Sequence, residues 1–215
     1  MAKRRATQVA LTRIYTRTGD DGTTALGDLS RTSKNDPRLV AYADVDEANS
    51  TIGVAMSLGS LDPDVVALLT RVQNELFDLG ADLCMPVVEN PPYPPLRVAE
   101  EYVTALESAC DAYNARLEPL RSFVLPSGTP GAALLHVART VVRRAERSTW
   151  TALAAYPEAT SPRTARYLNR LSDLLFILAR VANLGPGDVC WTPGQTRSGQ
   201  TRSDPSRANP SPSDP

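Results

Sequence analysis

Two segments of this chain carry residue types suited to holding an anion. The first, residues 16–24, reads Thr-Arg-Thr-Gly-Asp-Asp-Gly-Thr-Thr and combines glycines with threonine hydroxyls. Glycines allow successive backbone N–H groups to converge on an anion, and the hydroxyls add further donors. The second segment, about 120 residues later, places Arg139, Arg143 and Arg147 at every fourth position. Together the two segments indicate a polyphosphate ligand such as a nucleoside triphosphate.

The glycine-rich segment permits two interpretations. It lacks the GxxxxGK[ST] spacing of a Walker A loop, so any phosphate contact here follows another design. The carboxylates of Asp20 and Asp21 would repel phosphate directly, but they could hold a Mg²⁺ ion that bridges to it. Gly-Asp-Asp-Gly is also good turn chemistry, so an ordinary turn is the alternative. Lys34 could reach the same anion or could be a surface lysine.

The arginine-rich segment lies in a stretch that predicts a helix over residues 129–153. On a helical wheel one side is apolar and carries Leu134, Val137, Ala138, Val141, Val142 and Ala145. The opposite side carries Arg139, Arg143, Glu146, Arg147 and Trp150. A solvated outer face of a bundle is one explanation, although such faces usually mix charges. Planar guanidinium forks suit phosphate oxygens, which favours an anion site. Arg144 lies off this row and is expected to pair elsewhere, with a subunit boundary as one option.

Composition limits the classes of function. At 215 residues with a formal net charge of −1, the chain fits one domain and has no global field that would attract nucleic acid or an anionic membrane. No apolar run approaches the roughly 20 residues that span a bilayer, and no apolar segment follows the basic start, so no secretory signal is expected. The three cysteines suit a reducing cytoplasm as buried free thiols, and with one histidine a zinc site is not expected.

The elements that must position these residues read as helices. Five are predicted, over residues 38–59, 63–83, 96–117, 129–153 and 161–184. Cap-then-proline pairs open three of them, at Asp62-Pro63, Thr129-Pro130 and Ser161-Pro162. Long helices with short links predict an all-α antiparallel bundle over residues 14–191, with the proline-rich link 86–95 as an extended crossing. Residues 1–13 are expected to be flexible, and the Pro/Ser-rich tail 192–215 to be disordered.

Six motifs in one order resemble the PduO-type family of ATP:cob(I)alamin adenosyltransferases. They read IYTRTGDDGTT at 14–24, KNDPR at 34–38, VDEANS at 45–50, FVLPSG at 123–128, RTVVRRAER at 139–147 and YLNRLSD at 167–173. The resemblance runs from residue 14 to about residue 191. It implies a five-helix bundle of the ferritin-like, cobalamin adenosyltransferase-like kind. It also implies a homotrimer whose active sites lie between neighbouring subunits.

The resemblance also implies roles for particular residues. ATP would be held by Thr16, Arg17, Thr18, Gly19, Thr24, Ala25, Lys34, Arg143, Arg144, Glu146, Arg147 and Asn169. Arg139 resembles the family arginine that pairs with an acid of the first helix, here Asp46. Arg143 resembles the one that contacts the triphosphate. Phe123 resembles the phenylalanine that packs against the corrin where a lower axial ligand would sit, and Mg²⁺ would accompany the phosphates.

Purely structural roles for these residues remain alternatives. Asp46 and Glu47 could be exposed helix acids, Asn169 could cap a backbone, and Phe123 could be core packing. His136 is expected to be structural, and Trp150 to serve packing or an interface. The family loop usually carries lysine where this chain has Arg17, which could alter phosphate geometry. Ala25 stands where relatives often carry a hydroxyl.

The resemblance implies a reaction in which cob(I)alamin attacks the 5′ carbon of ATP and triphosphate leaves. The chain offers no evident nucleophile or general base of its own, which fits that chemistry. An adenosylcobalamin-dependent mutase is an expected recipient of the product. Two alternatives are an ATP-binding bundle that senses or delivers cobalamin without turnover, and a di-metal carboxylate bundle. The second needs Glu-x-x-His pairs and fails with a single histidine.

Overall fold

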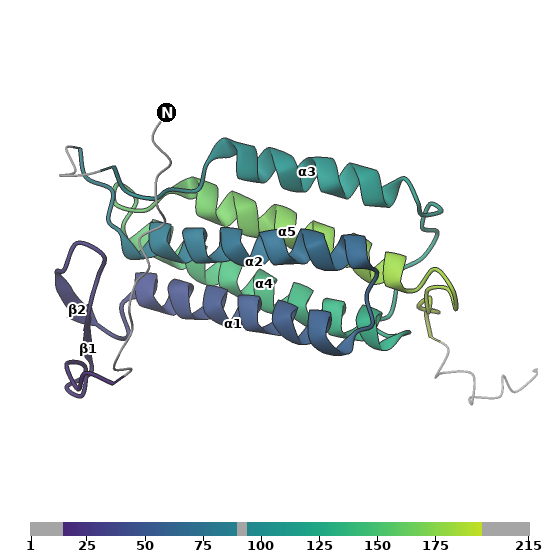
Figure 1. Cartoon of the computed structure of the whole chain (residues 1–215), viewed down its shortest axis with the longest axis horizontal. Coiled ribbons are helices and arrows are strands. Elements are labelled where there is room, and N and C mark those ends of the chain that lie inside the picture. Colours follow the sequence, from purple (N-terminus) through teal and green to yellow (C-terminus); the bar gives the residue numbers. More distant parts are fainter. Residues whose placement is uncertain (1–14, 90–93, 195–215) are drawn as a thin grey trace, which may run out of the picture.

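The protein was analysed as a computed structural model, which describes residues 15–89 and 94–194. The N-terminus expected to be flexible, part of the 86–95 link and most of the tail lie outside these residues. Five helices run alternately up and down: α1 (Pro37–Leu58), α2 (Pro63–Cys84), α3 (Glu100–Asn114), α4 (Pro130–Ala155) and α5 (Pro162–Ala182) (Figure 1). Four of the five lie within two residues of their predicted bounds at each end, so the predicted bundle is confirmed.

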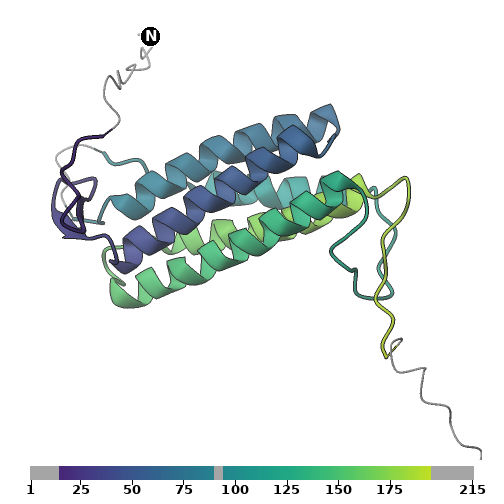
Figure 2. The same cartoon turned by 90° about the horizontal axis from the view of Figure 1, so that it is seen from below.

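The helices form a bundle in which α1 packs on α2 and α4, and α5 packs on α4 and α3. Figure 2 shows α1 and α4 running side by side along most of their length. The shared core is aliphatic and includes Ile52, Leu69, Leu76, Leu106, Leu135, Leu168 and Leu175. Because each helix contributes an apolar stripe to this core, burial rather than helix propensity supplies most of the stability. No helix in the described part of the chain is both long and apolar enough to cross a membrane.

A short hairpin precedes the bundle and was not predicted. Strand β1 (Thr23–Ala25) pairs antiparallel with β2 (Arg31–Ser33), and Thr24 lies opposite Thr32. The hairpin sits at one end of the bundle, beside the start of α1 (Figure 1). It therefore holds the glycine-rich segment against the bundle end at which α1 begins.

The third helix begins four residues later than predicted, and the reason is a buried ion pair. Arg97 donates to a carboxylate oxygen of Asp82 at 2.7 Å, and the backbone N–H of Val98 donates to the other oxygen at 2.8 Å. Arg97 also donates to the carbonyl of Met85. These bonds hold residues 96–99 extended along the end of α2, so the apolar periodicity there does not become helix. The expectation that the three cysteines are buried is also wrong, because Cys190 is exposed and Cys84 and Cys110 are only half-buried.

Candidate functional site

The glycine-rich segment folds so that the Lys34 ammonium lies over its backbone. Lys34 N–H donates to the carbonyl of Gly22 at 2.9 Å, and Gly22 N–H donates to the carbonyl of Gly19. A Cβ atom placed on Gly19 would lie 3.1 Å from Lys34 Nζ and 2.9 Å from the Thr23 carbonyl oxygen. Glycine is therefore required by close approach, and Lys34 lies beside the loop, although its role toward an anion stays a prediction.

The loop is held by Arg31, a residue that the sequence analysis did not single out. Its guanidinium donates to the Thr18 carbonyl at 2.7 Å and to the Thr23 hydroxyl, and it lies 3.5 Å from the Asp21 carboxylate. Asp21 in turn accepts from the Thr23 hydroxyl and N–H, and these bonds hold the pKa of that carboxyl below its usual range. The segment is thus a genuine turn as well as a cluster of donors. The hairpin register that sets Arg31 beside it carried no sequence signal.

Thr16, Arg17 and Thr18 are exposed and present donors to solvent, whereas Thr24 is half-buried. The hydroxyls of Thr16 and Thr18 lie 2.9 Å apart. Arg17 adopts a left-handed backbone conformation with φ of 62°, and its guanidinium lies 5.6 Å from the centre of the Tyr15 ring. Thr24 and Ala25 belong to β1. These positions leave the face of the loop open to a ligand.

A buried carboxylate fixes the hairpin to the bundle. Asp36 caps α1 by accepting from Arg38 N–H at 2.9 Å, and it also binds the Arg38 guanidinium at 3.0 Å. It accepts further hydrogen bonds from the hydroxyls of Thr32 in β2 and Tyr156 at the end of α4. Bonding to Arg38 is the main cause that lowers the pKa of the Asp36 carboxyl strongly. Three segments therefore meet at one charged group.

The arginine row occupies the face of α4 toward α5. Arg143 and Arg147 are exposed, and within the described ranges their side chains make no hydrogen bond or ion pair. Arg139 is half-buried, and its Nε atom is buried with no hydrogen-bond partner. Burial, followed by the charge of Arg143, lowers the pKa of the Arg139 guanidinium. Guanidinium groups without a counter-charge can bind an anion, so this row is a candidate anion-binding surface.

Within one chain, Arg144 pairs away from the arginine row, as expected, whereas the expected pair of Asp46 with Arg139 is not formed. Asp46 is exposed, and among the described residues it makes no ion pair with Arg139. Instead Arg144 pairs with Asp44 at 3.2 Å and with Glu47, so it does not need a neighbouring subunit. The antiparallel register explains both results, because Asp44 lies level with Arg144 and Asp46 is displaced from Arg139 along the helix axes.

Glu146 and Asn169 form a side-chain hydrogen bond between α4 and α5. The Asn169 amide donates to the Glu146 carboxylate at 3.3 Å and accepts from Arg170 at 2.8 Å. Asn169 therefore binds side chains rather than capping a backbone. The pair borders a hollow of about 610 Å³ whose walls are Glu146, Trp150, Pro162, Arg163, Ala165, Arg166 and Asn169.

Phe123 lies at the other end of the same face, and its ring is 77% exposed, which excludes a core-packing role within one chain. It borders a second hollow of about 610 Å³ with Leu120, Ser122, Val124, His136, Arg139 and Phe176. A smaller cavity of about 200 Å³, lined by Arg139, Arg143, Ser172, Asp173, Phe176 and Ile177, adjoins it. Apolar walls thus meet the arginine row at Arg139.

His136 lines this apolar hollow, which the sequence analysis did not predict. The side chain is 2% exposed, and neither ring nitrogen has a hydrogen-bond partner among the described residues. Burial, followed by the charge of Arg139, lowers the pKa of its imidazole. The ring is therefore neutral at pH 7 and lies 6.0 Å from that of Phe176.

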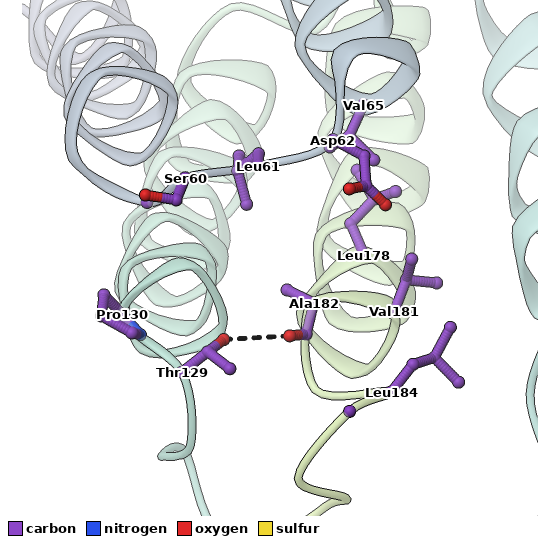
Figure 3. Close-up of a pocket in the computed structure, with 12 residues that line it drawn as sticks. Ser60, Leu61, Asp62, Val65, Thr129, Pro130, Leu178, Val181, Ala182 and Leu184 are labelled. Atoms are coloured by element: carbon purple, nitrogen blue, oxygen red, sulfur yellow. Dashed lines mark hydrogen bonds between the residues drawn. The ribbon is translucent and has the colours of Figure 1, made fainter.

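A further pocket of about 430 Å³ lies where the turn from α1 to α2 meets the start of α4 and the end of α5 (Figure 3). Its walls include Leu61, Val65, Leu178 and Leu184, and Asp62 is its one charged residue. Thr129 donates to the Ala182 carbonyl at 3.0 Å and closes α4 against α5 there. None of the predicted site residues lines this pocket, so it is not part of the candidate site.

One chain brings the predicted residues together in two groups rather than one. Residues 16–34 gather at the hairpin, whereas the arginine row, Asn169 and Phe123 lie along α4 and α5. No hydrogen bond or ion pair within residues 15–89 and 94–194 joins the hairpin to Arg139, Arg143 or Arg147. Among these described residues there is also no cluster of three or more His, Cys, Asp or Glu that could hold a metal.

Known proteins are similar to this chain in sequence over most of its length. A corrinoid adenosyltransferase from Mycobacterium tuberculosis (strain ATCC 25618 / H37Rv) is 64% identical over 190 residues, which cover 88% of this chain and 98% of the relative. A corrinoid adenosyltransferase from Bacillus subtilis (strain 168) is 44% identical over 82% of this chain and 91% of its own length.

Solved structures agree with the sequence relatives. A variant of a PduO-type ATP:corrinoid adenosyltransferase from Lactobacillus reuteri, complexed with cobalamin and ATP, superposes with a TM-score of 0.76 at 36% identity. The match covers 83% of this chain and 99% of that one. The family model described as cobalamin adenosyltransferase matches residues 14–182. The chain therefore belongs to the cobalamin adenosyltransferase family.

Proposed function

We propose that this protein transfers the 5′-deoxyadenosyl group of ATP to the cobalt of a cob(I)alamin substrate. The observation that carries the proposal is the meeting of an unpaired arginine row with an apolar hollow at Arg139. A triphosphate needs the first surface, and the face of a corrin ring needs the second. The relatives named above act on, or are complexed with, these two substrate classes.

The reaction is a displacement at carbon. The Co(I) centre of the substrate supplies an electron pair to C5′, the Co–C bond forms, and the C5′–O bond breaks. The pair from that bond leaves with triphosphate, and the cobalt becomes formally Co(III). No proton has to move, which agrees with a groove that offers no nucleophile–base pair.

The protein would contribute charge stabilisation and alignment. Arg143 and Arg147 carry free charges that can offset the charge developing on the leaving triphosphate. Lys34 and the donors of residues 16–24 can hold the same phosphates from the other side. Phe123 would lie against the corrin, exclude a lower axial ligand and so make reduction of Co(II) easier. Holding both reactants in line lowers the entropic part of the barrier.

Magnesium would enter with the phosphates rather than through a protein cage. Asp21 is engaged by Thr23 and Arg31, which leaves Asp20 as the loop carboxylate without a partner in the described part of the chain. One carboxylate together with phosphate oxygens and water is a usual set of Mg²⁺ ligands. The bound ion would neutralise phosphate charge.

We further propose that the site is completed between subunits of a homotrimer. The separation of the hairpin from the arginine row within one chain supports this arrangement. So do exposed apolar side chains on α1 and α4, including Val54 at 45%, Val137 at 51% and Trp150 at 54% exposure. Light scattering coupled to size exclusion would test the trimer. Transfer of the product to an adenosylcobalamin-dependent mutase in the cytoplasm also belongs to the proposal.

The decisive experiment is anaerobic incubation with ATP and chemically reduced cob(I)alamin, followed by visible absorbance. Conversion to the adenosylcobalamin spectrum, with triphosphate released in equal amount, is the expected result. Tight binding of both substrates without conversion would instead support a protein that senses or delivers cobalamin.

A further inference from the structure

The ring of Phe123 is held by a second aromatic residue from the end of the described chain. The rings of Phe123 and Trp191 pack edge to face, with centroids 5.9 Å apart and planes inclined at 63°. This is a favourable arrangement for aromatic quadrupoles. Phe123 and Trp191 are 77% and 45% exposed, so their contact lies on an otherwise open surface.

Backbone hydrogen bonds fix the two segments that carry these rings. Trp191 N–H donates to the Phe123 carbonyl at 2.8 Å, and Leu125 N–H donates to the Val189 carbonyl at 2.7 Å. The Ser122 hydroxyl donates to the Trp191 carbonyl at 2.8 Å. The segment 188–191 is thus an antiparallel strap laid along the loop that presents Phe123.

Arg180 near the end of α5 anchors both segments of this device. Its Nε atom donates to the Asp188 carboxylate at 2.8 Å, and its Nη2 atom donates to the Glu118 carbonyl at 2.9 Å. The guanidinium is buried, so this pairing is shielded from water and salt. One rigid helix therefore sets the position of the strap and of the Phe123 loop together.

Trp191 does not line the hollow beside Phe123, although it touches the Phe123 ring. An effect of Trp191 on a corrin in that hollow must then pass through Phe123. We propose that Trp191 is a positioning residue that fixes the orientation of the Phe123 ring toward the corrin substrate. This inference rests on the proposed function, in which Phe123 displaces the lower axial ligand of cobalt.

The test compares two assays of the same variants. One starts from Co(II) corrinoid with a reductant, and the other from pre-reduced Co(I), which no longer needs ligand displacement. Trp191→Ala should lower the rate from Co(II) roughly tenfold, leave the Kd for ATP unchanged and leave the Co(I) rate within about twofold. Trp191→Phe, which keeps an aromatic edge, should behave like the parent. EPR of bound Co(II) corrinoid with ATP should show more residual nitrogen hyperfine splitting from the lower ligand in Trp191→Ala.

A double variant separates positioning from direct contact. Phe123→Ala should already lose the rate from Co(II), and adding Trp191→Ala should cause no further loss, because residues acting through one another are not additive. Phe77→Ala is the matched control, since it removes a phenylalanine of similar exposure (71%) on α2, remote from the strap. Melting temperatures identify any variant that fails to fold, and Trp191→Leu replaces Trp191→Ala in that case.

The outcomes distinguish the inference from the function beneath it. A Trp191 variant that matches the parent while Phe123→Ala is impaired would overturn the positioning role alone. Additive losses would also overturn it, because Trp191 would then act independently of Phe123. A Phe123→Ala chain as active as the parent from Co(II) would refute the axial-ligand role of Phe123 and, with it, this inference.

Discussion

The Tyr156 hydroxyl donates a hydrogen bond to the Asp36 carboxylate at 3.0 Å, across 120 positions of sequence. Asp36 caps α1, and Tyr156 follows the last residue of α4. The Arg38 guanidinium lies 4.0 Å from the centre of the Tyr156 ring and binds the same carboxylate. This contact ties the hairpin, α1 and α4 into one unit at the end of the bundle that carries the glycine-rich loop.

Asp36→Asn should therefore destabilise the fold and reduce the loss of stability that occurs as the pH is lowered. Losing one partner of a buried pair costs about 3–5 kcal/mol when the other charge stays buried, and roughly half of that is expected here because Arg38 can turn toward solvent. The pKa of Asp36 is lowered in the fold, so its contribution is present above the ordinary value near 3.8 and is lost progressively as pH falls from there toward the much lower folded pKa. Thermal unfolding at pH 7 measures the loss of stability, and a series from about pH 5 to about pH 2 follows the acid response. Asp64→Asn, at an exposed ion pair, is the control and should leave stability almost unchanged.

His136 should make the protein less stable on mild acidification. Its pKa is lowered in the fold, so the unfolded chain binds the proton more readily, and stability falls as pH drops below about 6.5. Arg139 opposes the proton, and Asp188 favours it only in part. His136→Gln should remove this component of the pH dependence between pH 7 and pH 5. An unchanged slope in that variant would show that the imidazole is not buried in its neutral form.

Gly19→Ala should weaken ATP binding without unfolding the protein. The added methyl group would lie 2.9 Å from the Thr23 carbonyl oxygen and would displace the Lys34 ammonium. A loss of about 1.4 kcal/mol corresponds to a tenfold higher Kd, which calorimetry with ATP would detect. Gly185→Ala is the matched control, since its methyl group would meet nothing within 4 Å. Equal ATP affinity in the two variants would remove the loop from the nucleotide site.

Arg143→Ala should abolish transfer while the assembly stays intact. The guanidinium is exposed and unpaired in the described part of the chain, so its removal costs little folding energy. Loss of one group that stabilises developing charge lowers kcat by about 100-fold or more. Arg116→Ala removes a guanidinium that pairs with Asp64 instead, and it should retain parental turnover. Normal turnover by Arg143→Ala would refute its assigned role.

The sequence predicted what depends on local pattern and did not predict what depends on register. Apolar periodicity and cap-then-proline pairs located the bundle, because those signals act within a few residues. Thr129 does cap α4 through Ala132 N–H at 3.1 Å, whereas Asp62 and Ser161 occupy cap positions without a side-chain cap bond. The contacts of Arg31 and the Asp82–Arg97 ion pair depend on how segments pack against one another. The spacing of residues in the sequence therefore did not predict them. Asp46 was expected to pair with Arg139, but the register of α1 on α4 does not bring the two together within one chain.

The candidate site was predicted in its chemistry but not in its distribution. Residue types alone indicated donors for polyphosphate, and the exposed Arg143, Arg147 and Lys34 agree with that. The sequence could not show that the loop and the arginine row form two separate groups within one chain, because distance along the sequence does not reveal distance in the fold. It also gave no sign that Trp191 would lie against Phe123, since edge pairing of two short segments has no periodicity.

The separation of the hairpin from the arginine row has a genetic consequence. Under the proposed intersubunit arrangement, a chain is the unit of folding but not the unit of catalysis. When ATP is limiting, co-expression of two alleles with complementary lesions, Gly19→Ala and Arg143→Ala, should therefore give more activity than either allele alone, since some mixed assemblies contain an intact pair of halves. A lesion that unfolds the chain, such as one at the Gly59–Gly131 contact between α1 and α4, should be rescued by neither allele.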